Sequence, residues 1–342
     1  MGIKTNNNFG ALRLVFASLV ILSHSPEIID GNRSREVLSK VFGTISFGDL
    51  SVDCFFLISG YLISKSFYST NSIRNFIVKR ILRIYPGFIV ASIISICVFA
   101  PLSIGWALIS NIQAADWLKS LLKMATLDPP YVEGVFRNAK HPELNGSMWT
   151  IMLEFLCYLS IPIFYKLGLN KRKYYFLTVL FCALIFVFII ITKIANHFHN
   201  PFFVYHFSRL LTAFLVGGAF YHYSDIIIWN KKISIACFIA LCISLTHHLT
   251  SEFGLFTFGG YLLFNFALNF KNKFLNSVGT TNDISYGVYL YAWPFQNLIV
   301  QYFPTISPWV LTCYTLLFTI IIGYLSWLIV EKPFMQMKKF FN

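Results

Sequence analysis

The sequence predicts an all-α, polytopic membrane protein with about ten transmembrane helices. Of its 342 residues, 56% are hydrophobic and 12% are charged, whereas soluble domains carry about 25% charged residues. Apolar windows of about 20 residues recur along the chain, and a helix of this length crosses a bilayer core. These observations exclude a soluble enzyme, a disordered chain and a nucleic-acid-binding protein, although the net charge is +13.

The apolar windows define the expected spans within one integral-membrane domain over residues 1–342. The spans cover residues 9–25, 44–66, 84–105, 147–167, 174–194, 203–222, 233–250, 253–270, 284–302 and 309–330. The first window has the length of a signal-peptide core, but no small-x-small cleavage site precedes the polar SHSPE sequence. We therefore expect it to be retained as a span.

The distribution of basic residues predicts the orientation. With the N-terminus in the cytoplasm, 17 of the 27 Lys and Arg residues fall in cytoplasmic segments and 8 in outer segments. Cytoplasmic loops of membrane proteins carry an excess of Lys and Arg. We therefore expect both termini in the cytoplasm and a multi-pass protein of the cell inner (plasma) membrane.

The first expected helix carries two ionisable residues, Arg13 and His24. An ionisable group inside a membrane is costly and marks a functional site by default. Eleven residues on a helix rotate by about 20° beyond three full turns and rise about 16 Å. We expect both side chains to face one cavity, with Arg13 toward the cytoplasm and His24 toward the outer side. The alternative is that Arg13 reaches lipid phosphates and His24 is an interfacial histidine.

Two carboxylates are candidates for orienting the His24 ring. Asp53 lies in the second span at a depth close to that of His24 and is slightly favoured, since a carboxylate beside a histidine fixes its tautomer. Glu154 lies about two turns below the outer surface in the fourth span. The alternatives are an Asp53 paired with a lysine or capping a helix, and a Glu154 paired with Arg209. Gly60 is explained at least as well by close helix packing.

A basic helical face precedes the third span. Arg80 and Arg83 are three residues apart, in the sequence RILRIYP, and therefore share one face. The planar guanidinium suits polyphosphate recognition because it binds bidentately. The excess of positive charge in cytoplasmic loops accounts for the number of these residues but not for their alignment.

No metal site and no disulfide bond are predicted. The histidines and cysteines show no metal-binding spacing and no disulfide framework. His247 and His248, near the end of a span, are rival catalytic histidines. The ninth span contains SYGVYLYAWPF, whose rings an interfacial aromatic belt would partly explain.

These residues resemble the membrane acyltransferase-3 family, which includes O-antigen and peptidoglycan O-acetyltransferases. Six segments match in the family's order: the Arg13–His24 pair, VDCFFLISGYLI, RILRIYP, SMWTIMLE, SYGVYLYAWP and EKPF. The resemblance implies ten helices, acyl-CoA as cytoplasmic donor, and an envelope glycan as acceptor. It also implies that His24 is the essential catalytic residue and that Arg13, Arg80 and Arg83 recognise the donor.

Two further residues of the matching segments, Trp149 and Tyr286, are expected to bind substrate. The chain departs from the family pattern at Ala292, where many relatives have a histidine, and at Ser51, where glycine is common. A second catalytic histidine in the ninth span is therefore not expected.

The sequence thus predicts an O-acyltransferase that moves an acyl group, most simply acetyl from acetyl-CoA, to a hydroxyl of an envelope glycan such as O-antigen or exopolysaccharide. His24 would act as a base or as a nucleophile, with Asp53 and Glu154 as its candidate catalytic partners. Expected partners are acyl-CoA, the glycan acceptor and membrane lipid, without nucleic acid, metal or permanently bound cofactor. The alternatives are a flippase for a lipid-linked sugar, a glycan polymerase or ligase, and an acyltransferase that uses His247 or His248.

Overall fold

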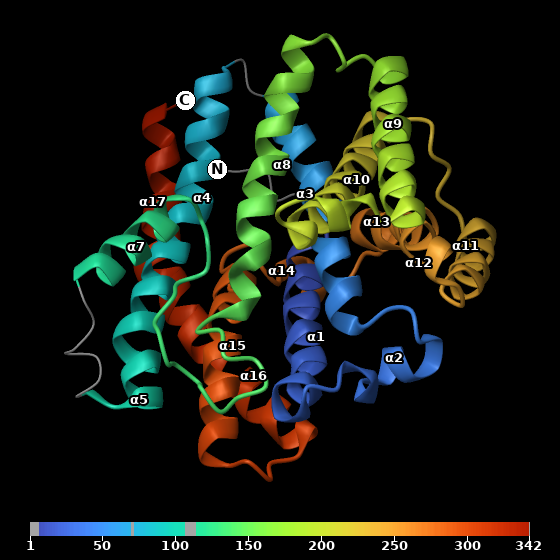
Figure 1. Cartoon of the computed structure of the whole chain (residues 1–342). Coiled ribbons are helices and arrows are strands. Elements are labelled where there is room, and N and C mark those ends of the chain that lie inside the picture. Colours follow the sequence, from blue (N-terminus) through green and yellow to red (C-terminus); the bar gives the residue numbers. More distant parts are fainter. Residues whose placement is uncertain (1–6, 70–71, 107–113, 342) are drawn as a thin grey trace.

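The computed structural model describes residues 7–69, 72–106 and 114–341, and within them every regular element is a helix (Figure 1). The longer helices are α1 (Phe9–Asp30), α3 (Phe47–Tyr68), α4 (Ile73–Ile94), α8 (Trp149–Lys166), α9 (Arg172–Thr192), α10 (Pro201–His222), α11 (Lys231–Ser244), α13 (Gly260–Asn269), α15 (Ser285–Tyr302) and α16 (Pro308–Ser326). The all-helical fold class is therefore confirmed.

Shorter helices complete the described chain. They are η1 (Arg33–Arg35), α2 (Val37–Phe42), η2 (Ser95–Phe99), α5 (Ala100–Ile104), α7 (Ala114–Ala125), η3 (Gly146–Met148), η4 (Ile194–His197), α12 (His248–Gly254), η5 (Leu255–Gly259), α14 (Lys273–Ser277), η6 (Trp327–Glu331), α17 (Lys332–Gln336) and η7 (Met337–Phe341). Three of them, η2, η5 and η6, are π-helical turns that join α-helices into longer rods.

Seven segments of the described chain are long and apolar enough to cross a membrane. They are Phe9–Asp30, Phe47–Tyr68, Ile73–Ile104, Gly146–Lys166, Arg172–Thr192, Pro201–His222 and Pro308–Phe340. The remaining three expected spans also contain helices, namely α11, the α12–α13 rod and α15. α11 has only 14 residues, or about 21 Å of helix against a core of about 30 Å. The count of ten and the sides of the termini remain predictions.

Two expected boundaries differ from the structure. The third span was expected to begin at residue 84, but α4 begins at Ile73, where the Ser72 side chain accepts a hydrogen bond from the Asn75 N–H. Arg80 and Arg83 therefore lie on the same rod as the apolar residues that follow. The expected span 233–250 is divided, because α11 ends at Ser244 and the His247 side chain caps the next helix.

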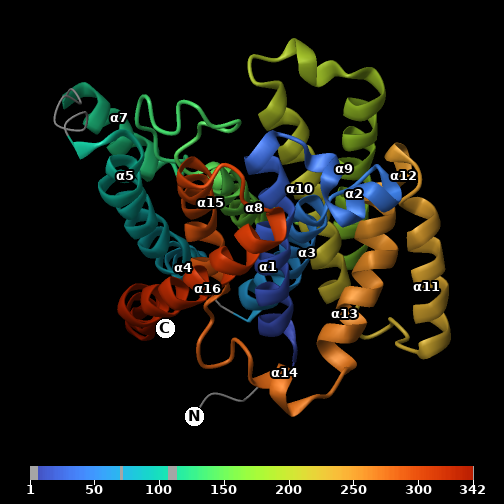
Figure 2. The ribbon, with the colours of Figure 1, turned by 90° about the horizontal axis from the view of Figure 1, so that it is seen from below.

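α1 lies near the centre of the bundle and packs against α3, α15 and α16 (Figure 2). α3 and α10 approach each other most closely at two glycines. A Cβ on Gly60 would lie 1.8 Å from the Phe214 carbonyl oxygen, and one on Gly217 would lie 2.0 Å from that of Leu57. The packing interpretation of Gly60 is therefore confirmed, and this contact holds α3 in place beside α1.

Candidate active site

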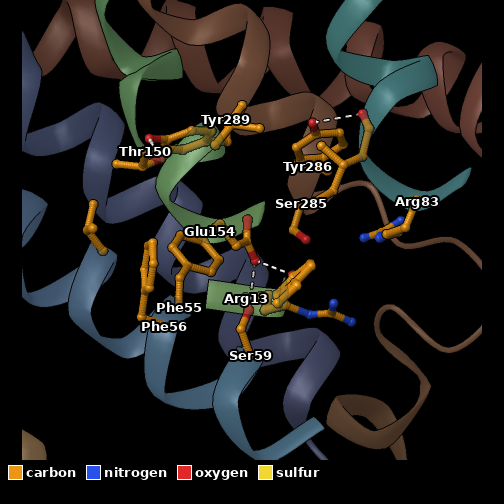
Figure 3. Close-up of a pocket in the computed structure, with 14 residues that line it drawn as sticks. Arg13, Phe55, Phe56, Ser59, Arg83, Thr150, Glu154, Ser285, Tyr286 and Tyr289 are labelled. Carbon is orange, nitrogen blue, oxygen red and sulfur yellow. Dashed lines mark hydrogen bonds between the residues drawn. The ribbon is translucent and has the colours of Figure 1, made fainter. Parts of the chain in front are cut away.

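A cavity of about 100 Å³ lies between α1, α3, α4, α8 and α15 (Figure 3). It has room for only a few water molecules, each of which takes about 30 Å³ of liquid. Its lining includes Arg13 from α1, Arg83 from α4, Glu154 from α8 and Tyr286 from α15. Four of the expected site residues therefore meet around one space, although they come from distant parts of the sequence.

Arg13 and Arg83 are bound to the same carboxylate. Asp283, in the turn that precedes α15, lies 3.0 Å from the Arg13 guanidinium and 2.7 Å from that of Arg83. Arg83 also lies 3.3 Å from Glu331, which is buried in η6. The two arginines expected to bind the donor thus occupy a compact, charge-balanced cluster at one end of the cavity.

Asp283 remains ionised in this cluster. Burial by itself raises the pKa of Asp283, but the guanidinium groups of Arg13 and Arg83 outweigh it and hold the pKa below its ordinary value. An incoming anion that binds these arginines must therefore compete with a permanent negative charge.

Arg80 lies on the same helix but does not belong to the described lining of the cavity. Its guanidinium lies 5.5 Å from the centre of the Phe76 ring and donates to the Ser66 hydroxyl at 3.3 Å. Arg80 therefore lies outside the described lining of the cavity, about 4.5 Å before Arg83 along the helix axis.

Glu154 points into the cavity and is held by two hydroxyl groups. Its Oε1 accepts a hydrogen bond from Ser59 at 2.8 Å and another from Tyr158 (Figure 3). The alternative pairing of Glu154 with Arg209 is wrong, because Arg209 is bound by acids of α3 and α12 instead.

Two tyrosines of α15 line the cavity. Tyr286 donates to the Ile84 carbonyl at 3.1 Å, and Gly87 leaves room for its ring, since a Cβ there would lie 2.8 Å from it. Tyr289 donates to the Ser147 carbonyl and shares a hydrogen bond of 2.9 Å with Thr150. Both rings are therefore fixed by backbone or hydroxyl partners on other helices.

His24 makes its hydrogen bond with Glu27, one turn further along α1. The distance from His24 Nδ1 to Glu27 Oε2 is 2.9 Å. Because an ionised carboxylate only accepts hydrogen bonds, Nδ1 carries a proton, and in the neutral ring the free lone pair is therefore that of Nε2. Nε2 makes no hydrogen bond within the described residues, so it is the ring atom available for chemistry.

Glu27 is itself held by residues outside α1. Arg33 binds it bidentately, at 3.0 Å to Oε2 and 2.7 Å to Oε1. His141 Nε2 lies 3.7 Å from Oε1. The Glu27 side chain is 8% exposed, so both oxygens depend on these partners rather than on water.

The expectation that Asp53 or Glu154 orients the His24 ring requires a correction. Asp53 lies 3.3 Å from the Arg209 guanidinium and is fully buried, while Glu154 bonds to Ser59 and Tyr158. Glu27 takes the orienting position because a residue three positions away lies on the same helical face.

The expected single cavity for Arg13 and His24 also requires a correction. Arg13 lines the cavity, but His24 is not among its described lining residues. Instead, the His24 ring packs edge-on against Trp293 with 4.9 Å between ring centres. Trp293 lies one turn beyond Tyr289 on α15, so one helix supplies a ring that lines the cavity and a ring that contacts His24.

The remaining candidates lie elsewhere. Trp149 packs against Phe202 and His206, with ring centres 5.0 and 4.7 Å away, and does not line the described cavity. His247 accepts a hydrogen bond from the Leu249 N–H at 3.2 Å as a helix cap. Among the residues that the structure describes, no group of histidine, cysteine and carboxylate side chains could hold a metal ion.

Sequence reasoning missed several residues of the site: Glu27, Arg33, His141, Asp283 and Glu331. Glu27 carried a usable signal, because SHSPE places it three residues after His24 on a helix. Glu331 belongs to the EKPF segment, and Arg33 lies only six residues after Glu27. The contacts of His141 and Asp283 join residues more than a hundred positions apart, and no local pattern indicates them.

Comparison with known proteins agrees with the motifs. The model of a family described as an acyltransferase domain matches residues 6–328. The chain is 28% identical over 348 residues to a protein named O-acetyl transferase from Shigella phage Sf6, with 96% of each chain covered. It is 23% identical over 362 residues to Nodulation protein 10 of Rhizobium leguminosarum bv. viciae, covering 97% of this chain and 94% of that protein. No solved structure matches. Since the family model spans nearly the whole chain, the protein belongs to the acyltransferase-3 family of membrane acyltransferases.

Proposed function

We propose that the protein is an O-acyltransferase of the cell inner membrane that transfers an acyl group, most simply acetyl, from cytoplasmic acyl-CoA to a hydroxyl of an envelope glycan. The observation that carries the proposal is the His24–Glu27 pair, which leaves Nε2 of His24 available. Family membership and the relative named O-acetyl transferase support the reaction class. The donor and the acceptor are parts of the proposal.

His24 acts through Nε2 by one of two routes. As a base, it takes the proton of the acceptor hydroxyl while that oxygen attacks the thioester carbonyl, the C–S bond breaks, and the proton passes to the departing thiolate. As a nucleophile, Nε2 attacks the thioester carbonyl, the C–S bond breaks, and CoA leaves as a thiolate with the acyl group on Nε2. The acceptor hydroxyl then attacks this acyl group, the Nε2–C bond breaks, and the hydroxyl proton passes to the thiolate or to water. Both routes need the tautomer that Glu27 stabilises.

The donor binds at the other end of the site. Arg13 and Arg83 hold the phosphate groups of CoA, which compete with Asp283 for the two guanidiniums. Arg80 extends this cationic face along α4. The cavity of about 100 Å³ is smaller than the 300–1,000 Å³ or so of a pocket for a drug-sized ligand. The acyl-bearing arm therefore enters only when the site opens, and it reaches His24 only when the Tyr289 and Trp293 side chains move.

Substitution of the histidine tests the proposal. The His24→Ala variant should insert and fold normally, but membranes containing it should transfer no label from [¹⁴C]acetyl-CoA to envelope glycan, because the group that activates the hydroxyl or carries the acyl group is missing. The matched control is His199→Ala, which removes an exposed histidine from the turn before α10.

The measurement is radioactivity in purified envelope glycan after incubation of membranes with the labelled donor. The His199→Ala variant should label the glycan at the wild-type level. Labelling by the His24→Ala variant at that level would overturn the role of His24. A wild-type protein that labels no glycan, but exchanges a lipid-linked sugar across vesicles, would favour the flippase alternative.

A further inference from the structure

A second cavity, of about 550 Å³, lies at the end of the bundle that contains the C-terminal end of α1. Its wall combines the end of α1, the end of α5, loop residues 134–140 and the end of α15. These helix ends lie toward the bottom of Figure 1, away from the C-terminus. The volume falls within the range of about 300–1,000 Å³ that ligand sites occupy.

The wall of this cavity is built by specific hydrogen bonds. Ser103 of α5 accepts a hydrogen bond from the Phe136 N–H at 2.9 Å and donates to Gln301 of α15 at 3.0 Å. Gln301 in turn donates to the Ser103 carbonyl at 2.9 Å. The loop and the two helix ends are therefore fixed to one another.

The charge of the cavity wall is positive. Arg137 and Lys140 line it, and no carboxylate does so among the described residues. Neither cation forms an ion pair in the part of the chain that the structure describes. Asp30, which attracts Lys140, is already paired with Arg35. Both cations are exposed, and the counter-charge that acts on Lys140, Asp30, is shared with Arg35.

The cavity is lined by the part of α1 that follows His24 and Glu27. Ile28, which lines it, follows Glu27 directly and lies one turn beyond His24 on the same face of α1. Lys140 also precedes His141, whose Nε2 lies 3.7 Å from Glu27. One turn of helix rises about 5.4 Å, so the lining of this cavity begins about one turn beyond His24 along α1.

We infer that this cavity binds the acceptor glycan through an anionic group, either a sugar carboxylate or a phosphate, held by Arg137 and Lys140. This inference rests on the proposed function and names the class of acceptor: an acidic glycan, or a glycan on a phosphate-bearing lipid carrier. The cation pair fixes the anionic group while a hydroxyl of the neighbouring sugar turns toward Nε2 of His24.

Binding of defined probes to the full chain, in nanodiscs of phosphatidylcholine, tests the inference. Trigalacturonate supplies carboxylates and is compared with neutral maltotriose, and farnesyl diphosphate supplies phosphates and is compared with farnesol. At least one anionic probe should bind about tenfold or more tightly than its neutral counterpart, because one charge-assisted contact is worth at least this factor.

The variant Arg137→Gln/Lys140→Gln should lose that preference, whereas Arg137→Lys/Lys140→Arg should keep most of it. The matched control, Lys119→Gln/Lys193→Gln, removes two exposed lysines that do not line the cavity. It should change the dissociation constant less than about twofold, since charges in solvent beyond a Debye length are screened. Elution of each variant as a folded monodisperse species excludes misfolding as the cause.

The outcomes separate the sources of the anion. Binding of trigalacturonate alone indicates an acidic sugar, and binding of farnesyl diphosphate alone indicates the carrier phosphate. The inference is overturned if neither anionic probe binds more tightly than its neutral counterpart, or if Arg137→Gln/Lys140→Gln and the control Lys119→Gln/Lys193→Gln lose this preference equally. It is also overturned if only phosphatidylglycerol added to the nanodisc occupies the cavity. Because these measurements need no acyl donor, they stand apart from the His24→Ala test: a failed transfer reaction leaves the binding result interpretable.

Discussion

Glu27 determines which nitrogen of His24 is available for chemistry. Its carboxylate accepts a hydrogen bond from the Nδ1–H of His24, with 2.9 Å between Nδ1 and Oε2. The bidentate contact with Arg33 keeps that carboxylate from rotating away. Trp293 packs against the other side of the imidazole ring, and Gly146 makes room for it, since a Cβ there would lie 2.6 Å from the indole. The histidine is therefore held by Glu27 and Trp293 before any substrate arrives.

The role of Glu27 can be tested by a substitution that keeps its shape. Glu27→Gln should lower kcat for glycan acetylation by about 10- to 100-fold, because an amide neither stabilises the protonated ring nor imposes one tautomer. The KM values for both substrates should stay near those of the wild type, and Glu27→Asp should restore part of kcat. The measurement is steady-state kinetics on purified protein in nanodiscs. A rise in KM with unchanged kcat would instead assign Glu27 to substrate binding.

At the scale of elements, close contact between α3 and α10 positions one side of the cavity. Gly60 and Gly217 let the two helix backbones touch, and Ser59, beside Gly60, reaches Glu154 across the cavity. The buried charges of Asp53 and Arg209 join the same two helices, 3.3 Å apart. Ser59 of α3 thus contributes to the site only because its neighbour Gly60 has no side chain and lets the two helices pack closely.

This contact predicts the effect of a single methyl group. Gly60→Ala places a Cβ 1.8 Å from the Phe214 carbonyl oxygen, so the helices must separate, and overpacking of this kind costs about 1–3 kcal/mol. The melting temperature of the purified protein should fall by several degrees, and activity should fall with it as Ser59 moves from Glu154. The control, Thr178→Ala on the exposed face of α9, removes only a bond within its own helix and should melt as the wild type does. Equal melting of both variants would contradict the packing argument.

At the scale of the whole molecule, the proposed donor and acceptor sites each have their own pair of basic residues. One end holds Arg13 and Arg83 around Asp283, and the other holds the His24–Glu27 pair beside the cavity with Arg137 and Lys140. Tyr289 of α15 lines the cavity at the first end, and Trp293, one turn further along the same helix, packs against His24. This arrangement allows substitutions at one end to leave the other end unaffected.

The separation predicts distinct kinetic effects. Arg83→Gln should raise the KM for acetyl-CoA by about 10- to 100-fold, since a charge-assisted contact contributes about 1.5–3 kcal/mol, and it should not change the affinity for the acceptor. Arg83→Lys keeps a charge beside the buried Glu331 and serves as the variant that folds if the glutamine variant does not. The control is Arg172→Gln, which removes an exposed arginine paired with Asp225 and should not change the KM. An unchanged KM for the donor in both Arg83 variants would exclude this arginine from donor binding.

The sequence by itself determined the helical membrane class, the family, and the candidates Arg13, His24, Arg83, Glu154 and Tyr286. It could do so because apolar length, buried charge and short motifs are local properties of a chain. Only the tertiary structure decided that Glu27 rather than Asp53 orients His24, that Asp283 joins Arg13 to Arg83, and that His24 packs against Trp293 outside the described lining of the cavity. These outcomes depend on which helices pack together, because a side chain on one helix can be paired or enclosed only by neighbours that distant segments supply.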